Sequence, residues 1–378
     1  MMGSWRQAPA TFEDAGLGSV RTVNSSEVTG LQRIGATLVF VTLKACTAQA
    51  PNWHPNADEF IRCIPSRCVA TPPHVKTCCP CAGDGLQRNV VWNGSLHTST
   101  LKEGDLHATP QGLLHSAINP TCGDVEYLAV FNSANVVTEK AIPALLKMPQ
   151  ATEYMDLGGF GAFMDANPNP PSGAIYALGG NCSQLCADNA TVAPATDGGS
   201  SGPDRFAASL SNAPVVVEDE HGSHRLLTAA ELPALGDVKK GASFSFTTVK
   251  NCSFPAPHYM PHANKVTMPV AGAVNVSVLV NGTQLLSHEL GTTGDFFILP
   301  KADLFSLSNE LCRDAEIVAY WDTADAAKTY PLADLALLPE DQLAGAFGVE
   351  GEPPLQPAAP GAFWPFADPA CSERCSRG

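Results

Sequence analysis

The chain has 378 residues and a formal net charge of −15, from 22 Lys and Arg against 37 Asp and Glu. This acidic balance argues against a nucleic-acid-binding surface, which needs clustered basic side chains. Hydrophobic residues make up 44% of the chain and charged residues 16%, which provides enough apolar material for a core and excludes a largely disordered chain. No apolar run is long enough for a transmembrane helix. The 32 Gly and 31 Pro favour tight turns and predict an all-β fold.

Cysteines and glycosylation motifs favour a secreted protein. The chain has 13 Cys, and Asn-x-Ser/Thr motifs occur at Asn24, Asn93, Asn181, Asn189, Asn251, Asn275 and Asn281. No signal peptide is recognisable before Gly18. We therefore expect an extracellular protein whose sequence is truncated at its N-terminus.

The two halves of the chain repeat each other. At an offset of 206 positions, CTAQAPNWHPNADE (46–59) matches CSFPAPHYMPHANK (252–265). At an offset of 190, GDLHATPQGLLHSAIN (104–119) matches GDFFILPKADLFSLSN (294–309). This repeat predicts a first module at 12–193, a Gly/Ser/Pro-rich linker at 194–203, a second module at 204–370 and a tail at 371–378.

The change of offset places 16 extra residues in the first module, roughly at 63–83. This stretch contains Cys63, Cys68, Cys78, Cys79 and Cys81. One interpretation is a metal or redox loop, although two Cys-x2-Cys pairs at zinc-site spacing are missing. The other is an insertion that replaces part of a strand, for example through a faulty gene model. The sequence leaves both open.

The second module carries the clearest strand signals. Val274, Val276, Val278 and Val280 alternate with other residues and precede Asn281-Gly282, which predicts a strand and a tight hairpin. The segments 295–300 (DFFILP) and 316–321 (EIVAYW) are typical of short buried strands. Leu, Ala and Met at helical spacing predict a helical tail in each module, at 142–157 and 332–347.

His54, Glu59 and His115 are the candidate metal ligands. A His and a carboxylate on one element and a distant His on another can converge on one divalent ion. Imidazole and carboxylate together suit Mn, Fe, Zn or Ni. These residues alone do not distinguish ligands from buried or surface histidines.

The spacing around these residues resembles that of the cupin superfamily. Its second motif, G-x5-P-x-G-x2-H-x3-N, is matched at every defined position by Gly104, Pro110, Gly112, His115 and Asn119. Its first motif is matched in part, with Asn52 at the first His, His54 at the second and Glu59 at the carboxylate. The chain resembles germin-like proteins, and specifically the two-module bicupins that include oxalate decarboxylases.

The resemblance implies two jelly-roll (cupin) barrels in tandem, each with a short helical tail. It implies Mn as the usual metal, with Fe or Zn as alternatives, bound in the first barrel by His54, Glu59 and His115 and weakly by Asn52. In the second module His258 matches the first His, but Met260, Lys265 and Phe305 replace the other ligands. We expect this barrel to hold no metal and to have a structural role.

The expected activity stays open between two classes. Oxalate decarboxylases carry an Arg where this chain has Gln49, and they use a Glu on a lid near the position of Glu139. The first hypothesis is a secreted, Mn-binding bicupin with weak oxalate-type decarboxylase or oxidase activity and Glu139 as proton donor. The second is a non-catalytic extracellular or cell-wall glycoprotein. Expected partners are a small carboxylate such as oxalate and further copies of the chain, with no nucleic acid or membrane.

Eight cysteines outside the Cys-rich stretch occur at related positions in the two modules. Cys46, Cys122, Cys182 and Cys186 each have a counterpart in the second. They form either a disulfide framework repeated twice or buried thiols. The connectivity cannot be derived from the sequence. A pair between Cys182 and Cys186 would require a loop, because i, i+4 positions on a helix do not suit disulfide geometry.

Overall fold

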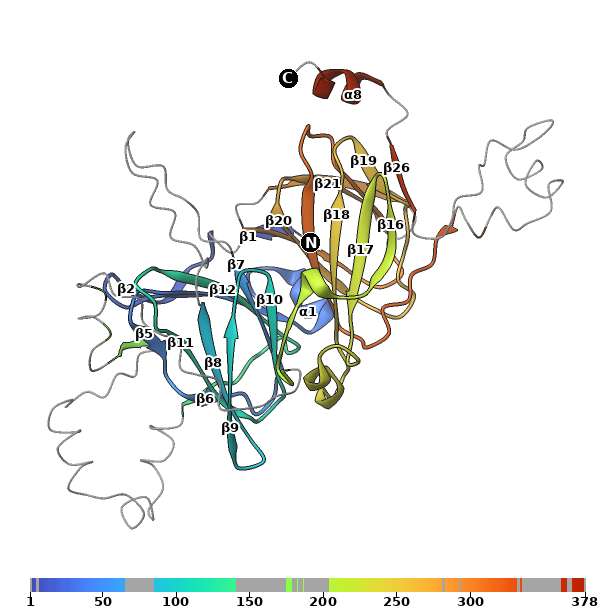
Figure 1. Cartoon of the computed structure of the whole chain (residues 1–378). Coiled ribbons are helices and arrows are strands. Elements are labelled where there is room, and N and C mark those ends of the chain that lie inside the picture. Colours follow the sequence, from blue (N-terminus) through green and yellow to red (C-terminus); the bar gives the residue numbers. More distant parts are fainter. Residues whose placement is uncertain are drawn as a thin grey trace, which may run out of the picture. The chain divides into compact units, whose positions relative to one another are not determined.

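The computed structural model describes residues 2–4, 7–64, 85–140, 175–178, 182, 186, 204–280, 283–291, 294–331, 334, 362–365 and 369–376. These residues divide into two units, which we call the first and second barrels. The first barrel comprises Gln7–Ser209 and Leu232–Val238, and the second comprises Met1–Arg6, Leu210–Glu231 and Lys239–Gly378. Strands dominate both barrels, which confirms the predicted all-β class (Figure 1).

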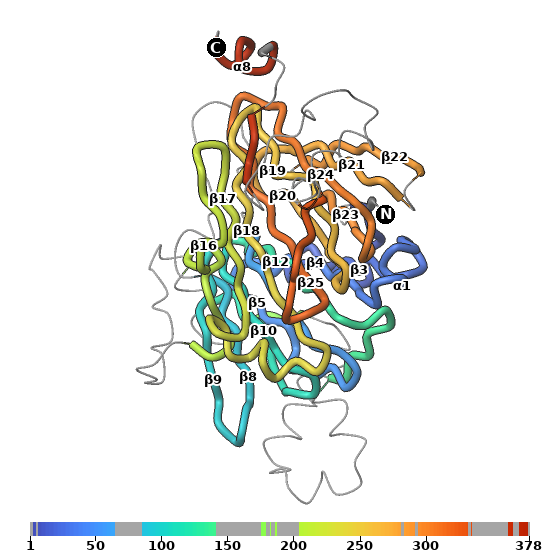
Figure 2. The backbone as a smooth tube through the Cα atoms, turned by 90° about the vertical axis from the view of Figure 1, so that its right-hand side faces the viewer, coloured from blue at the N-terminus to red at the C-terminus, as the bar shows by residue number. Residues whose placement is uncertain are grey.

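Two sheets form the first barrel. The first sheet has the order β15 (Ala207–Ser209), β10 (Asp105–Thr109), β7 (Glu59–Ile64), β12 (Val125–Phe131), β4 (Thr37–Leu43), β3 (Gly18–Val23), β2 (Ala10–Asp14). The second has the order β13 (Glu139–Lys140), β6 (Asn52–Trp53), β11 (Leu114–Asn119), β5 (Thr47–Gln49), β14 (Ile175–Ala177). On β11 a hairpin of β8 (Leu86–Trp92) and β9 (Ser95–Leu101) extends this sheet (Figure 2). Helix α1 (Thr29–Ile34) and the 3-10 helix η3 (Pro233–Asp237) complete this unit.

The second barrel repeats this plan. Its large sheet has the order β1 (Met2–Ser4), β23 (Asp295–Leu299), β20 (Lys265–Ala271), β25 (Ala315–Trp321), β18 (Ser243–Val249), β17 (Gly222–Leu227), β16 (Val215–Asp219). Two smaller sheets consist of β22 (Gln284–Leu290), β21 (Val274–Val280) and β24 (Leu304–Ser308), and of β19 (Ser253–Pro255) with β26 (Phe363–Pro365). The 3-10 helix η2 (Leu210–Asn212) and helix α8 (Pro369–Ser376) belong to the same unit.

Each barrel is completed by a strand from a distant part of the sequence. Strand β1 pairs with β23 in the second barrel, and β15 pairs with β10 in the first. The predicted modules at 12–193 and 204–370 leave β1 outside the second module and place β15 in it, whereas β1 pairs in the second barrel and β15 in the first. Hydrophobic patterning could not have found it, because both strands are only three residues long.

Alternation of inward and outward side chains builds both interiors. In β21, Val274, Val276 and Val278 are buried while the residues between them are partly exposed, which confirms the predicted strand. The predicted buried strands at 295–300 and 316–321 are β23 and β25. Met260 and Phe305 belong to the hydrophobic core of the second barrel.

Two matching asparagines support the last strand of the repeated motif. Asn119 Nδ2 donates to the carbonyl oxygens of Leu43, Lys44 and Gly123, and Asn309 Nδ2 donates to those of Val249, Lys250 and Arg313. Each buried amide thus links the end of one strand to the loop that follows its own strand. The final Asn of the repeated motif therefore has a structural role in both barrels.

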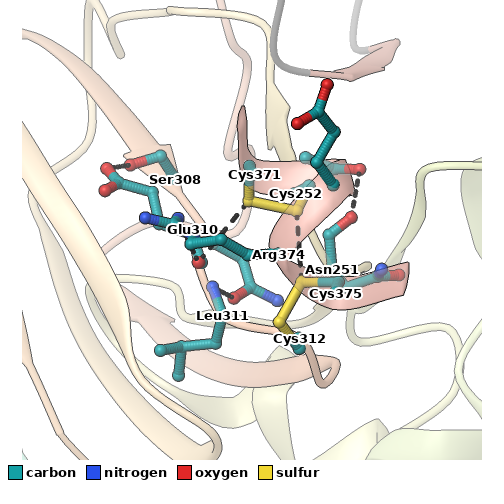
Figure 3. The surroundings of a disulfide bond; sticks show 12 residues. Asn251, Cys252, Ser308, Glu310, Leu311, Cys312, Cys371, Arg374 and Cys375 are labelled. Atoms are coloured by element: carbon teal, nitrogen blue, oxygen red, sulfur yellow. Dashed lines mark hydrogen bonds between the residues drawn. A yellow bond between two sulfur atoms is a disulfide. The ribbon is translucent and has the colours of Figure 1, made fainter. Parts of the chain in front are cut away.

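The disulfide framework is present and repeats. Cys46 bonds to Cys182 and Cys122 to Cys186, while Cys252 bonds to Cys371 and Cys312 to Cys375. Figure 3 shows the second set, in which Cys371 and Cys375 of α8 reach the barrel, with the sulfurs of Cys252 and Cys375 3.6 Å apart. The two cysteines of each Cys-x3-Cys motif therefore bond to different strands or loops and not to each other.

Several predicted elements lie outside the described residues. They are the helical tails at 142–157 and nearly all of 332–347, the linker at 194–203, and the Cys-rich stretch beyond Ile64. Cys63, the first cysteine of that stretch, lies in β7 and is buried. Within the described part of the chain, no helix is long and apolar enough to span a membrane.

Candidate metal centre

Three strands bring the predicted ligands together in the first barrel. Asn52 and His115 lie opposite each other on β6 and β11, and Glu59 begins β7 opposite Thr109 of β10. The turn before β11 contains Gly112 at φ 84°, a left-handed conformation that favours glycine. The backbone N–H of Gly112 donates to His54 O at 3.0 Å, which links this turn to the segment after β6.

His54, Glu59 and His115 form one buried cluster. His115 Nε2 lies 3.0 Å from Glu59 Oε2, and His54 Nε2 lies 3.9 Å from the same oxygen. The two imidazole rings have centroids 5.0 Å apart. All three side chains are buried. The structure therefore places three of the four predicted ligands within reach of one ion.

Backbone carbonyl groups contact the Nδ1 atoms of both His54 and His115. Nδ1 of His115 lies 2.9 Å from Leu113 O, and Nδ1 of His54 lies 3.3 Å from Val137 O. Because a carbonyl oxygen can only accept, a neutral ring carries its proton on Nδ1 and its lone pair on Nε2. Neither Nε2 atom has a hydrogen-bond partner among the described residues. The orphaned nitrogens face the Glu59 carboxylate, so the donor set fits a divalent cation.

Burial and the charge of Arg88 together determine the charge states of His54 and Glu59. Burial lowers the pKa of His54 from 6.5 to about 4, so its ring is neutral near neutral pH. Burial opposes ionisation of Glu59, but the positive charge of Arg88 beside it favours the carboxylate, and the pKa of that carboxyl lies well below its usual value. The cluster thus combines a neutral imidazole with a carboxylate, the protonation state in which both can bind a metal.

Asn52, the weak fourth ligand expected from the sequence, is buried opposite His115. Its Nδ2 donates to Ala50 O at 2.9 Å, while its Oδ1 is buried without a hydrogen-bond partner among the described residues. An amide oxygen is a ligand for hard cations. The role of Asn52 as a weak fourth ligand stays a prediction.

Arg88 is the residue that sequence reasoning missed. Its Nη2 donates to Glu59 Oε2 at 2.7 Å and to Thr109 Oγ1 at 3.3 Å, and its side chain is fully buried. Its Nε and Nη1 atoms have no partner within the described part of the chain. In LQRNVVW (86–92), Leu86, Arg88 and Val90 share the inward face. This alternation of buried and exposed residues indicates a strand with Arg88 on its inner face. The strand was not predicted, because it follows directly after the Cys-rich stretch.

A cavity of about 470 Å³ reaches His54 and Glu59. Gln49 also lines it and accepts a hydrogen bond from the Tyr127 hydroxyl at 3.0 Å. Thr138 and Lys140 line the cavity, whereas Glu139 between them is exposed. In this conformation the Glu139 carboxylate is not placed to deliver a proton to a ligand in the cavity. Its role as proton donor stays a prediction.

The equivalent positions of the second barrel hold no comparable cluster. His258, Met260, Lys265 and Phe305 occupy the positions of Asn52, His54, Glu59 and His115. The bridge between His258 and Phe305 repeats the pairing of Asn52 with His115. A thioether, an ammonium group and a phenyl ring are poor partners for a hard divalent cation.

The fold and the buried histidine–carboxylate cluster define a two-barrel β-protein with a metal-capable first barrel. The family model described as Cupin matches residues 6–150 and 208–354, so the chain belongs to the cupin family. The two matched regions correspond to the two repeated modules and confirm the two-module, bicupin architecture.

Similar solved structures are oxalate decarboxylases. One, from a study of the Mn(II) centres of the Bacillus subtilis enzyme, has a TM-score of 0.72 and 18% identity, covering 97% of this chain and 89% of the other. The Bacillus subtilis enzyme at pH 4.6 has a TM-score of 0.71 and 17% identity, with 97% and 87% covered. A third, from work on substrate binding and a reaction-specificity switch, has a TM-score of 0.71 and 18% identity, with 97% and 89% covered. A search of curated proteins found no match.

Proposed function

We propose that the first barrel binds one divalent metal ion through His54, Glu59 and His115, with Mn preferred and Fe or Zn as alternatives. One observation carries this proposal. His115 Nδ1 lies 2.9 Å from Leu113 O, so a ring that donates there and carries no second proton directs its Nε2 lone pair at a carboxylate oxygen 3.0 Å away. Two lone pairs at this distance repel unless a cation lies between them. A proton can serve, but a metal ion also satisfies the orphaned His54 Nε2.

We further propose that the ligand of the first barrel is a small carboxylate such as oxalate. Arg88 supports this, because its unpartnered Nε–H and Nη1–H groups are donors of the kind that bind carboxylates. The resemblance places an Arg at the position that Gln49 occupies in this chain. In this proposal Arg88 of β8 supplies the guanidinium group instead. The oxalate decarboxylases of similar fold act on a ligand of this class.

In this proposal each side chain has a defined task. A bound divalent ion would supply Lewis acidity, polarising a carboxylate oxygen. His54, Glu59 and His115 would hold the ion, and Arg88 would orient the carboxylate and neutralise its charge. Tyr127 fixes the amide of Gln49, which lines the same cavity and can donate a further hydrogen bond.

A second candidate function is a non-catalytic secreted glycoprotein. The four disulfides favour an oxidising compartment for either candidate. Glycosylation motifs at Asn93, in the turn between β8 and β9, and at Asn251 are exposed and accessible for modification. These observations support secretion without requiring catalysis. Formation of homo-oligomers also stays a proposal.

The proposal is tested by metal content and by turnover. Mass spectrometry of protein loaded with Mn and then desalted should find about one metal ion per chain. His54→Gln should reduce this content strongly, and the exposed control His288→Gln should not. Loaded protein should convert oxalate, measured as formate or hydrogen peroxide. Absence of stoichiometric metal would refute metal binding, whereas bound metal without turnover would favour the non-catalytic candidate.

A further inference from the structure

The interior of the second barrel is lined by basic side chains. Lys265 of β20 occupies the position of the Glu59 carboxylate, and Lys328 occupies the position of Thr138, which contacts the His54 ring in the first barrel. The bridge between Tyr259 and Thr329 repeats the pairing of Trp53 with Glu139 and establishes this equivalence. The repeat has therefore exchanged a carboxylate for an ammonium group and added a second one.

The basic groups converge on one place. Lys328 Nζ lies 2.8 Å from His224 Nε2, and His224 Nδ1 lies 2.8 Å from Thr247 Oγ1. Lys265 Nζ lies 4.5 Å from the centroid of the Phe305 ring and 4.8 Å from that of Trp321. Lys328 Nζ lies 5.6 Å from the same Trp321 ring. The two ammonium groups thus share one aromatic side chain as neighbour.

No negative charge among the described residues balances this cluster. Neither Lys265 nor Lys328 forms an ion pair with a carboxylate within the part of the chain that the structure describes. His258, which is 3% exposed, donates from Nδ1 to Ala256 O, and its Nε2 has no hydrogen-bond partner among the described residues. Lys265 itself is 4% exposed.

A small cavity lies between these groups. Its volume is about 20 Å³, and His224, His258, Lys265, Lys328 and Tyr330 contribute its polar lining. A cavity needs roughly 10–15 Å³ to hold one water molecule. The space therefore suits a particle about the size of one or two water molecules, and it is too small for oxalate or phosphate.

Cations buried in this way need a compensating charge. Removing an ammonium group from water without a counter-ion is unfavourable, so it either loses its proton or acquires an anion. Burial lowers the pKa of Lys328 to about 7 and, together with Lys328, that of Lys265 well below its usual value. Near neutral pH, an anion that enters the cavity balances the buried positive charge and accepts hydrogen bonds from the N–H groups of Lys265 and Lys328.

We propose that the second barrel binds one small monovalent anion, between chloride and formate in size, held by Lys265 and Lys328. The site is distinct from the metal centre and does not depend on metal binding in the first barrel. The second barrel, for which the sequence predicts only a structural role, would thus have a ligand of its own.

Bromide provides the most direct test, because it resembles chloride and scatters anomalously. Crystals of the full chain grown in sodium bromide should show one anomalous peak within hydrogen-bonding distance of Lys265 Nζ or Lys328 Nζ. A parallel crystal in sodium formate should show density at the same place if carboxylates are accepted. Halide without formate would restrict the site to inorganic ions. Neither ion in the second barrel would overturn the proposal.

Thermal unfolding tests the site in solution. At constant ionic strength, chloride or bromide should raise the midpoint temperature relative to gluconate, which is too large for the cavity. Lys265→Met, which removes the buried charge and shortens the unbranched side chain by one atom, should abolish this difference. The control Lys250→Met removes an exposed lysine of the same barrel, paired with Asp314, and should retain it. Equal midpoints in chloride and gluconate for the unmodified chain would contradict the proposal.

The pH dependence provides a second readout. The anion favours the protonated form of Lys328, so its affinity should fall by about tenfold between pH 6 and pH 8. The other titratable groups facing the cavity are His224, His258, Lys265 and Tyr330. Burial lowers the pKa of both histidines and raises that of Tyr330 to about 12. An affinity that rises with pH would contradict the assignment of Lys328.

Discussion

Replacing Arg88 tests whether its positive charge weakens the binding of a metal ion in the first barrel. Its Nη2 lies 2.7 Å from Glu59 Oε2, the oxygen nearest to both histidine Nε2 atoms. A metal bound to that oxygen would lie about 2 Å from it, so at most about 5 Å would separate the cation from the guanidinium nitrogen. Arg88→Met should therefore strengthen the binding of divalent metal.

The size of this effect follows from Coulomb's law. A single positive charge and a divalent ion about 5 Å apart repel by about 2 kcal/mol at the dielectric constant of water and about 7 kcal/mol at an effective value of 20. The lower figure alone corresponds to roughly tenfold or more in affinity. Without Arg88, protonation of the buried Glu59 competes with the metal, so the titration should be carried out near pH 8, above the range of a raised carboxyl pKa.

Isothermal titration of metal-free protein with Mn²⁺ would measure the effect. Arg21→Met is a matched control, because Arg21 lies in the same barrel and pairs with Glu13 at the surface. The control should bind Mn²⁺ with unchanged affinity, and Arg88→Met should bind it at least about tenfold more tightly. If Arg88 also orients the carboxylate ligand, the same variant should lose oxalate turnover. Unchanged or weaker metal binding by folded Arg88→Met would show that Arg88 does not repel the bound ion.

Three further predictions concern stability. Burial lowers the pKa of His54 to about 4, so the neutral ring makes its full contribution to the stability of the metal-free protein above pH 6.5. Between pH 6.5 and pH 4 the free energy of unfolding should fall by about 3 kcal/mol, because the unfolded chain binds a proton that the buried ring does not. His54→Gln should flatten this part of the pH profile in urea unfolding, and an unchanged profile would show that His54 is not the titrating group. Asn119→Ala and Asn309→Ala should each lower the free energy of unfolding by about 2–3 kcal/mol, because in either barrel three carbonyl groups lose a hydrogen-bond donor. Thermal unfolding in which only one variant loses stability would show that the two amides are not equivalent. Replacing Cys46 and Cys182 by Ala should lower the free energy of unfolding by about 5 kcal/mol, because the disulfide spans 136 residues and restricts the unfolded chain. A loss below about 1 kcal/mol in chemical unfolding would count against a stabilising role of this disulfide.

The fold could be predicted because the repeated motifs fix backbone geometry as well as chemistry. The turn at Gly112 has a left-handed conformation that favours glycine, and Asn119 donates hydrogen bonds to three carbonyl groups around the end of its strand. Both features depend on residues close in sequence, which pattern reading detects. The strand exchange by β1 and β15 depends instead on pairing between distant segments of three residues, for which the sequence contains no periodic signal.

The candidate metal site could be predicted only in part. His54, Glu59 and His115 were found because the motif spacing selects them. Arg88 was not, since its effect depends on the distance between β8 and β7 across the barrel interior, and no motif includes it. Glu139 was chosen by its place in the sequence, but the alternation along β13 exposes its carboxylate and turns Lys140 towards the cavity.

Metal binding in the first barrel is tested most directly by anomalous diffraction at the manganese edge from crystals of the full chain loaded with Mn²⁺. We expect one strong peak per chain, bonded to His54 Nε2, Glu59 and His115 Nε2, with none beside Lys265 in the second barrel. A first barrel without a peak, in which Arg88 still pairs with Glu59 at saturating Mn²⁺, would show that this cluster does not bind the ion.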